Sequence, residues 1–131
     1  MRLLKPLNER KAKQTLINKL DRLFSKFIRE KYCEDRAGQC YTCGGWFLFK
    51  DLDAGHYIGR AYYSHRWDIR NVRPQCYDCN CLQEGKKGKF RLRLVEEYGE
   101  DVVSIMEGTK HKRKPDIFTL KYLINQYSIK K

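Results

Sequence analysis

Long hydrophobic runs are missing from this chain of 131 residues. No apolar stretch approaches the roughly 20 residues that a membrane-spanning helix needs, so we expect no membrane partner. The basic start of the chain is not followed by a hydrophobic stretch, which argues against a secretory signal peptide. Internal repeats and low-complexity tracts are missing too. Without export, the six cysteines are better interpreted as metal ligands or free thiols than as disulfides.

Acidic residues are also few: 16 Asp and Glu stand against 28 Lys and Arg, a formal net charge of +12. Residues 1–31 carry ten bases and three acids and residues 86–131 carry twelve and six, whereas residues 32–85 carry six and seven. Solvated helix faces could account for part of this excess, but it is larger than the roughly 2–8 charges typical of a soluble small domain. A positive field of this size attracts polyanions, so DNA is the expected partner.

The length and the hydrophobic periodicity predict one α+β domain. We expect a basic helical arm at residues 1–32, a zinc-stapled core at 33–98 and C-terminal helices at 99–131. Within the core, residues 46–49 and 53–58 are predicted strands, residues 59–73 a long loop, and a helix begins after Cys79. A short helix at 101–106, a basic linker at 110–115 and a last helix capped by Asp116 follow.

Two cysteine pairs share the same spacing, Cys40-x-x-Cys43 and Cys76-x-x-Cys79. Two intervening residues let both thiolates of a pair face one ion, and two pairs complete a tetrahedral zinc site. Unrelated buried thiols are the alternative, which the doubled spacing disfavours. We interpret Cys33 and Cys81 as non-ligands.

The segment between and just after these pairs contains an acid, a histidine and two asparagines: Asp53, His56, Asn71 and Asn80. A neutral histidine can take a proton from an attacking water, while a carboxylate and an amide oxygen can hold Mg²⁺ or Mn²⁺ on a phosphate. A closed Cys₄ zinc site has no open position for catalysis, so this second ion is needed. The alternatives are a structural role for His56 and a turn-capping role for Asp53.

This array resembles the HNH (ββα-metal) endonucleases, and Cys79-Asn80 is similar to their endonuclease VII type. The segments Asp53-Ala-Gly-His-Tyr57 and Gln75-Cys-x-x-Cys-Asn80, with Phe90-Arg91 and Leu94 downstream, resemble the NinG (Rap) family of phage recombination proteins most closely. The resemblance implies a zinc-stapled HNH-like core and cleavage of branched DNA such as Holliday junctions. It also implies a phage protein located in the host cytoplasm or at the nucleoid.

Carried over residue by residue, the resemblance makes His56 the general base, Asn80 a ligand of the catalytic ion and Asn71 the residue that braces the loop bearing His56. In most HNH enzymes the metal-binding acid directly precedes the histidine, whereas here Gly55 does. Positions 53 and 55 share one face of a strand, so Asp53 remains the candidate acid. His65 is a possible third ligand or a phosphate contact.

Basic residues of the central loop and of the next helix are the candidate DNA contacts: Arg60, Arg66, Arg70, Arg73, Lys86, Lys87 and Lys89. Arginines supply planar donors for phosphate, and the nearby rings of Tyr62 and Tyr63 can stack on unpaired bases. For Trp67, packing beneath the loop is the preferred interpretation.

Together these features predict a metal-dependent DNA endonuclease with structural Zn²⁺ and catalytic Mg²⁺ or Mn²⁺. Two symmetric cuts in a four-way junction would favour a homodimer. Two alternatives stay open: a non-catalytic zinc-knuckle nucleic-acid-binding protein, and an HNH nicking endonuclease with another substrate preference. The first alternative leaves Asp53, His56 and Asn80 unexplained.

Overall fold

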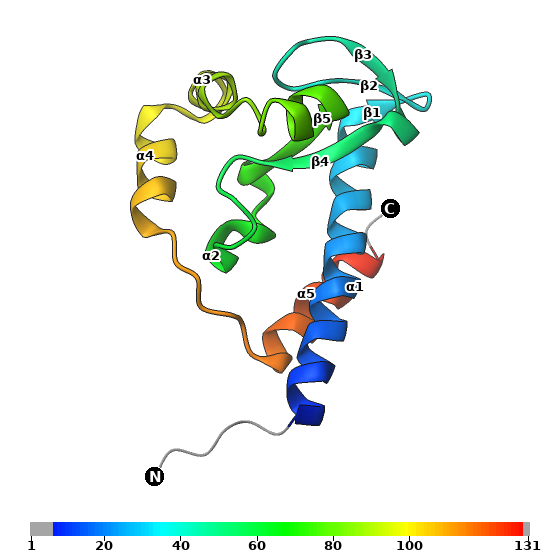
Figure 1. The fold of residues 1–131 in the computed structure, drawn as a ribbon, viewed down its shortest axis with the longest axis vertical. Coiled ribbons are helices and arrows are strands. Elements are labelled where there is room, and N and C mark those ends of the chain that lie inside the picture. Colours follow the sequence, from blue (N-terminus) through cyan, green and yellow to red (C-terminus); the bar gives the residue numbers. More distant parts are fainter. Residues whose placement is uncertain (1–6, 130–131) are drawn as a thin grey trace. The chain divides into compact units, whose positions relative to one another are not determined.

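The computed structural model describes residues 7–129, and their fold divides into two compact units (Figure 1). One unit contains the chain up to Phe27 together with the chain from Pro115 onward, and the other is Ile28–Lys114. The divisions between these units fall at 27/28 and 114/115. The division of one domain into an arm, a core and C-terminal helices stays a prediction. Within residues 7–129, no helix is long and apolar enough to cross a membrane.

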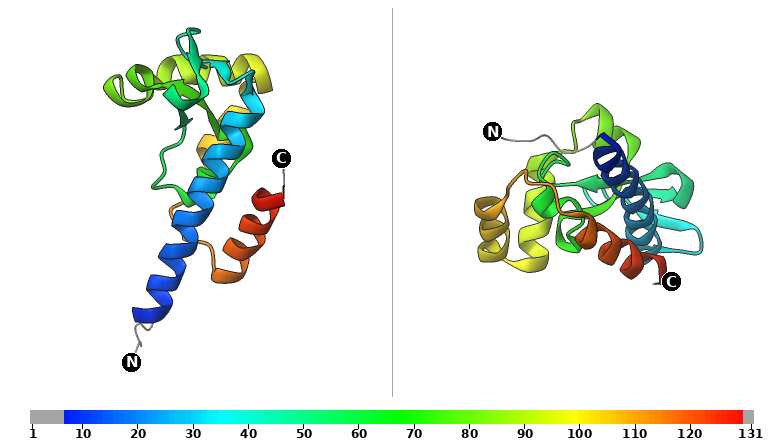
Figure 2. Two further views of the ribbon diagram at one scale, coloured as in Figure 1. Left: turned by 90° about the vertical axis from the view of Figure 1, so that its right-hand side faces the viewer. Right: turned by 90° about the horizontal axis from the view of Figure 1, so that it is seen from below.

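The first unit pairs the long helix α1 (Leu7–Tyr32) with α5 (Ile117–Ile129), which lie side by side in Figures 1 and 2. One face of α1 is apolar and buried, and Ile17, Leu20 and Phe24 belong to it. Phe24 meets Tyr127 edge to face, with ring centroids 5.0 Å apart. Asp116 caps α5 as predicted, because its Oδ1 accepts a 2.8 Å bond from the backbone N–H of Thr119.

The second unit begins with a small antiparallel sheet of β1 (Cys33–Glu34), β2 (Ala37–Gln39) and β3 (Trp46–Leu48). Asp35 and Arg36 join β1 to β2 with φ of 52° and 64°, and two positive φ values are typical of a type I′ hairpin turn. Only β3 was predicted. β3 is marked by its aromatic residues, a signal that β1 and β2 lack.

A second hairpin pairs β4 (Leu52–His56) with β5 (Val72–Cys76), following the 3₁₀ turn η1 (Phe49–Asp51). The strand predicted at 53–58 is confirmed in large part. The loop predicted at 59–73 is wrong in part, because it contains α2 (Tyr63–Arg66), η2 (Ile69–Asn71) and the start of β5. Gly55 is required in β4, since a Cβ there would lie 1.9 Å from Oε1 of Gln75.

The remaining elements are the π-type turn η3 (Asp78–Leu82) and the helices α3 (Lys87–Tyr98) and α4 (Glu100–Thr109). The two helices stand at the end of this unit opposite to the three-stranded sheet (Figure 1). Phe90 and Leu94 of α3 pack with Val103 of α4 in a buried cluster. The predicted helix thus begins at Lys87, and the expected linker at 110–115 is confirmed as non-helical.

Candidate metal centre and active site

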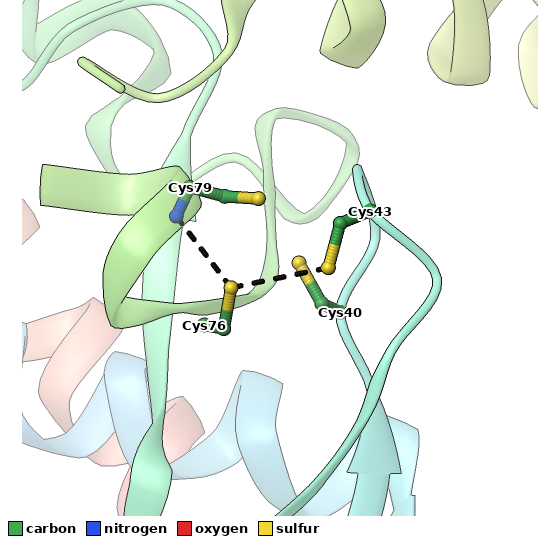
Figure 3. Close-up of side chains that lie close together, drawn as sticks. All are labelled: Cys40, Cys43, Cys76 and Cys79. Carbon is green, nitrogen blue, oxygen red and sulfur yellow. Dashed lines mark hydrogen bonds between the residues drawn. The ribbon is translucent and has the colours of Figure 1, made fainter. Parts of the chain in front are cut away.

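The four cysteines of the two pairs converge on one point (Figure 3). Cys40 and Cys43 come from the loop between β2 and β3, Cys76 ends β5, and Cys79 lies in η3. Their sulfur atoms all lie within 4.8 Å of one another, and Sγ of Cys43 is 3.9 Å from Sγ of Cys76. Four sulfurs bound at 2.3 Å around a tetrahedral zinc ion would stand about 3.8 Å apart. The cluster therefore fits a metal ion such as zinc, and Cys33 and Cys81 are not among its donors.

Backbone N–H groups turn toward the sulfurs of both pairs. Gly45 donates to Sγ of Cys43 at 3.4 Å, and Cys79 donates to Sγ of Cys76 at 3.5 Å. Burial alone would raise the pKa of Cys40, but N–H groups of neighbouring residues in both knuckles bring this pKa down to about 6. Burial and the adjacent thiols instead raise the pKa of Cys76 to about 12. The four thiols cannot all ionise together unless a cation neutralises them.

A buried polar chain connects the hairpin to the first cysteine pair. Nε2 of Gln75 donates to Oγ1 of Thr42 at 3.0 Å and to the carbonyl oxygen of Gly85 at 2.9 Å. Oγ1 of Thr42 in turn lies 3.6 Å from Sγ of Cys40. Such outer partners fix the orientation of metal ligands. The sequence gives no signal for them, because Thr and Gln are usually surface residues.

The structure brings together Asp53 and Asn80, the two residues predicted to bind a catalytic ion. Nδ2 of Asn80 donates to Oδ2 of Asp53 at 3.3 Å, and both residues are half-buried. Asp53 lies on β4 opposite Gln75, while Asn80 directly follows Cys79. A carboxylate of β4 and the amide of the residue after Cys79 therefore meet.

His56 ends β4, and its ring turns toward the carbonyl oxygen of Arg66, 2.8 Å from Nε2. A carbonyl oxygen only accepts hydrogen bonds, so Nε2 of the neutral ring must carry the proton. This tautomer leaves the basic lone pair on Nδ1. The backbone oxygen of His56 also accepts a hydrogen bond from Nζ of Lys87.

Asn71 has the bracing geometry that was predicted for it. Its fully buried amide accepts from the N–H of Ile58 at 2.7 Å and donates to the oxygens of Ile58 and His65 at 3.0 and 2.9 Å. The backbone carbonyl oxygen of Asn71 also accepts a hydrogen bond from the N–H of Tyr57 at 2.9 Å. Asn71 thereby joins the residues that follow His56 to the loop.

His65, the possible third ligand or phosphate contact, lies inside the loop. The side chain is buried, with Nδ1 2.9 Å from Oγ of Ser64 and Nε2 3.9 Å from Oδ2 of Asp68. Burial lowers the pKa of His65, which favours the neutral ring. Its contacts hold the loop together.

Arg73 corrects one predicted DNA contact. Its side chain is 1% exposed and donates to Oε2 of Glu97 at 2.7 Å and to the hydroxyl of Tyr98. Its guanidinium carbon also lies 4.6 Å from the ring centre of Tyr32. A buried, paired arginine has no donors to offer to an outside phosphate, so Arg73 is structural.

The other predicted contacts lie nearer the surface. Arg70 is paired with Asp68 at 2.8 Å, which offsets its charge. Arg66 lies 4.9 Å from the ring centre of Tyr63 and donates to the oxygen of Arg60 at 3.0 Å. Side chains at three further predicted positions are exposed, namely Arg60, Lys87 and Lys89, and Lys86 is half-buried. Trp67 is only 8% exposed, which confirms that it packs beneath the loop.

Comparisons with known proteins give one consistent result. The model of a family described as "NinG: Bacteriophage Lambda NinG protein" matches residues 3–131. The chain is similar to "Protein ninG" of Salmonella phage P22 (34% identity, 79% of this chain and 49% of the relative). It is also similar to "Protein ninG" of Escherichia phage 933W (30%, 79% and 50%) and of Escherichia phage lambda (28%, 92% and 57%). The chain thus spans about half the length of these relatives, and no solved structure matches it.

Proposed function

Because the chain belongs to the NinG family of bacteriophage proteins, we propose that it is a metal-dependent endonuclease of phage DNA metabolism. In this proposal the cysteine cluster holds a structural zinc ion, and the adjoining residues hydrolyse phosphodiester bonds. The proposal is supported by the geometry of three side chains: Asp53, His56 and Asn80.

The contact between Asp53 and Asn80 carries the proposal. The two residues are 27 positions apart in the sequence, and their polar atoms lie 3.3 Å apart. Turning the amide of Asn80 over would present its oxygen together with the carboxylate, a donor set that suits a hard divalent ion. Mg²⁺ or Mn²⁺ bound there would supply the Lewis acid that polarises a phosphate oxygen.

His56 is suited to the role of general base. Its Nε2–H is engaged by the oxygen of Arg66, so Nδ1 is the nitrogen that takes the proton of an attacking water. Asn71 braces the residues that follow His56, and Lys87 holds the backbone oxygen of His56. The base is therefore fixed in both tautomer and position before substrate binds.

The positive charge of the chain favours nucleic acid as the substrate. A preference for branched recombination intermediates belongs to the proposal through the resemblance to the NinG (Rap) family. A homodimer belongs to it because a four-way junction needs two symmetric cuts. An endonuclease that nicks other DNA substrates is the alternative within this class.

The test uses labelled four-way junction, flap and linear duplex, each with and without Mg²⁺ or Mn²⁺. We expect His56→Ala and Asn80→Ala to cut at least about 10²-fold more slowly with unchanged DNA affinity, since loss of a general base costs about 10²–10⁴-fold. Asp53→Ala should require more Mn²⁺ than the parent chain. Asn125→Ala and Asp51→Ala, at exposed positions, are the matched controls.

Cleavage at the parent rate by His56→Ala would refute its role as the base. Tight DNA binding without cleavage of any of the three substrates, in either metal, would support the non-catalytic zinc-knuckle protein instead.

A further inference from the structure

We propose that the linker at residues 110–114 and the loop at residues 59–67 form one surface that binds the phosphodiester backbone of DNA beside His56. We call it the linker–loop surface. This inference rests on the proposed function only in taking DNA as the ligand. Both segments belong to the unit Ile28–Lys114, and the linker runs past α2 in Figure 1.

A two-way clasp fastens the linker to the loop. The backbone N–H of His111 donates to Oγ of Ser64 at 2.8 Å, and the N–H of Ser64 donates to the oxygen of His111 at 3.2 Å. The N–H of Arg113 also approaches Nδ1 of His111 at 3.3 Å. The clasp gives a segment without regular secondary structure a defined place, 47 residues away from its partner in the sequence.

The clasp places the cations of the linker over an aromatic ring. Nζ of Lys110 lies 4.8 Å and Nζ of Lys112 lies 5.1 Å from the ring centre of Tyr62, and both lysines are exposed. Residues 59–67 and 109–115 contain no Asp or Glu but six Lys and Arg. Two ammonium groups that share one ring repel each other, and a phosphate between or above them would offset this repulsion.

Two acids close to the linker–loop surface already have partners. Asp68, which lies 3.9 Å from Nε2 of His65, is paired with Arg70 at 2.8 Å. The second acid is Glu107 of α4. Glu107 accepts from Nε of Arg91 at 2.9 Å and from the hydroxyl of Tyr57. Those bonds, and secondarily the charge of Lys110, lower the pKa of Glu107. The carboxylates of Asp68 and Glu107 are therefore engaged by Arg70 and Arg91.

The linker–loop surface reaches the candidate base through Arg66. The oxygen of Arg66 is the atom that holds Nε2 of His56, and the guanidinium of Arg66 donates to the oxygen of Arg60. A strand whose phosphates contact the linker would thus continue toward His56. Contacts of this kind position a nucleic acid without reading its sequence.

The experiment measures affinity for a linear DNA duplex as a function of salt, without divalent metal, for the parent and three variants. K110Q/K112Q removes two charges from the linker–loop surface, and R36Q/K50Q removes two exposed charges elsewhere in the same unit. Each lost phosphate contact reduces the slope of log K against log salt by about 0.9, so we expect a reduction of about 1.8 for K110Q/K112Q alone. S64A keeps every Lys and Arg and removes the hydroxyl that binds both the N–H of His111 and Nδ1 of His65. This loss should weaken DNA binding about two- to tenfold.

Equal salt slopes for the two double variants would overturn the proposed surface, as would parent-like affinity of K110Q/K112Q. A parent chain that cleaves DNA while K110Q/K112Q binds and cuts equally well would refute the surface and leave the endonuclease standing. A reduced salt slope for K110Q/K112Q, in a parent chain that cleaves no DNA, would support the surface and refute the endonuclease.

Discussion

Replacing Asn71 tests how strongly the loop after His56 is held. The Asn71 amide makes three hydrogen bonds of 2.7 to 3.0 Å and is fully buried. Asn71→Ala would leave the N–H of Ile58 and the oxygens of Ile58 and His65 without these partners. A buried polar group left unsatisfied costs about 1–3 kcal/mol, so the three groups together predict a loss of about 3–9 kcal/mol. That loss is large beside the 5–15 kcal/mol of a typical domain.

Urea unfolding followed by tryptophan fluorescence measures this loss, because Trp46 and Trp67 both lie in the unit Ile28–Lys114. Asn71→Asp tests whether the N–H donors of the amide are needed, because Asp has almost the same shape as Asn but lacks these donors. It keeps the acceptor for Ile58 but turns a second oxygen toward two carbonyl oxygens, so it should be destabilised as strongly as the alanine variant. Asn125→Ala, exposed on α5, is the control and should change stability by less than about 0.5 kcal/mol.

A free energy of unfolding within about 1 kcal/mol of the parent for Asn71→Ala would refute this reasoning, since one retained bond is worth about that much. It would mean that the loop carbonyls find other partners when the amide is removed.

Two further predictions use the same unfolding assay. Elemental analysis should find one zinc per native chain. Cys43→Ser should lose the zinc, and its unit should no longer unfold cooperatively. Parent protein that is folded but contains no zinc would contradict this prediction. Burial acts to raise the pKa of Glu97, but bonds from Arg73 and Tyr41 outweigh it and lower this pKa. Glu97 thus contributes stability above its unfolded pKa of about 4.3 that is lost on acidification. The stability gap between the parent and Glu97→Gln should therefore narrow from pH 6 to pH 3, and a constant gap would show that the charge of Glu97 is irrelevant.

The parts of the fold that the sequence predicts are those in which apolar residues recur with a helical or strand period. The apolar stripes of α1 and α5 and the aromatic strand β3 are of this kind. Cysteine spacing likewise predicts the metal cluster without any knowledge of the fold, because two residues suffice to aim both thiols of a pair at one ion.

Strand β5 could not be found in this way, because its buried positions include Arg73 and Gln75. Each is buried because a partner far away in the sequence accepts or donates: Glu97 for Arg73 and Thr42 for Gln75. The pattern of hydrophobic residues in the sequence does not reveal such long-range pairs. Because Glu97 is 24 residues away, Arg73 looks like a surface cation in the sequence. The clasp of the linker–loop surface joins residues 47 positions apart, so the sequence does not predict it either.

The cysteine cluster also sets the position of the candidate catalytic pair. Asn80 directly follows Cys79, a candidate metal ligand. Asp53 lies opposite Gln75, whose amide reaches Cys40 through Thr42. Asp53 and Asn80 are therefore held by residues that a bound zinc ion would fix. Neither of the two is a zinc ligand in the proposal. Removing zinc should separate Asp53 from Asn80 before it affects the packing of Phe90 against Leu94. A structural ion that aligns a second metal site in this way explains why four residues of a small chain would be committed to zinc.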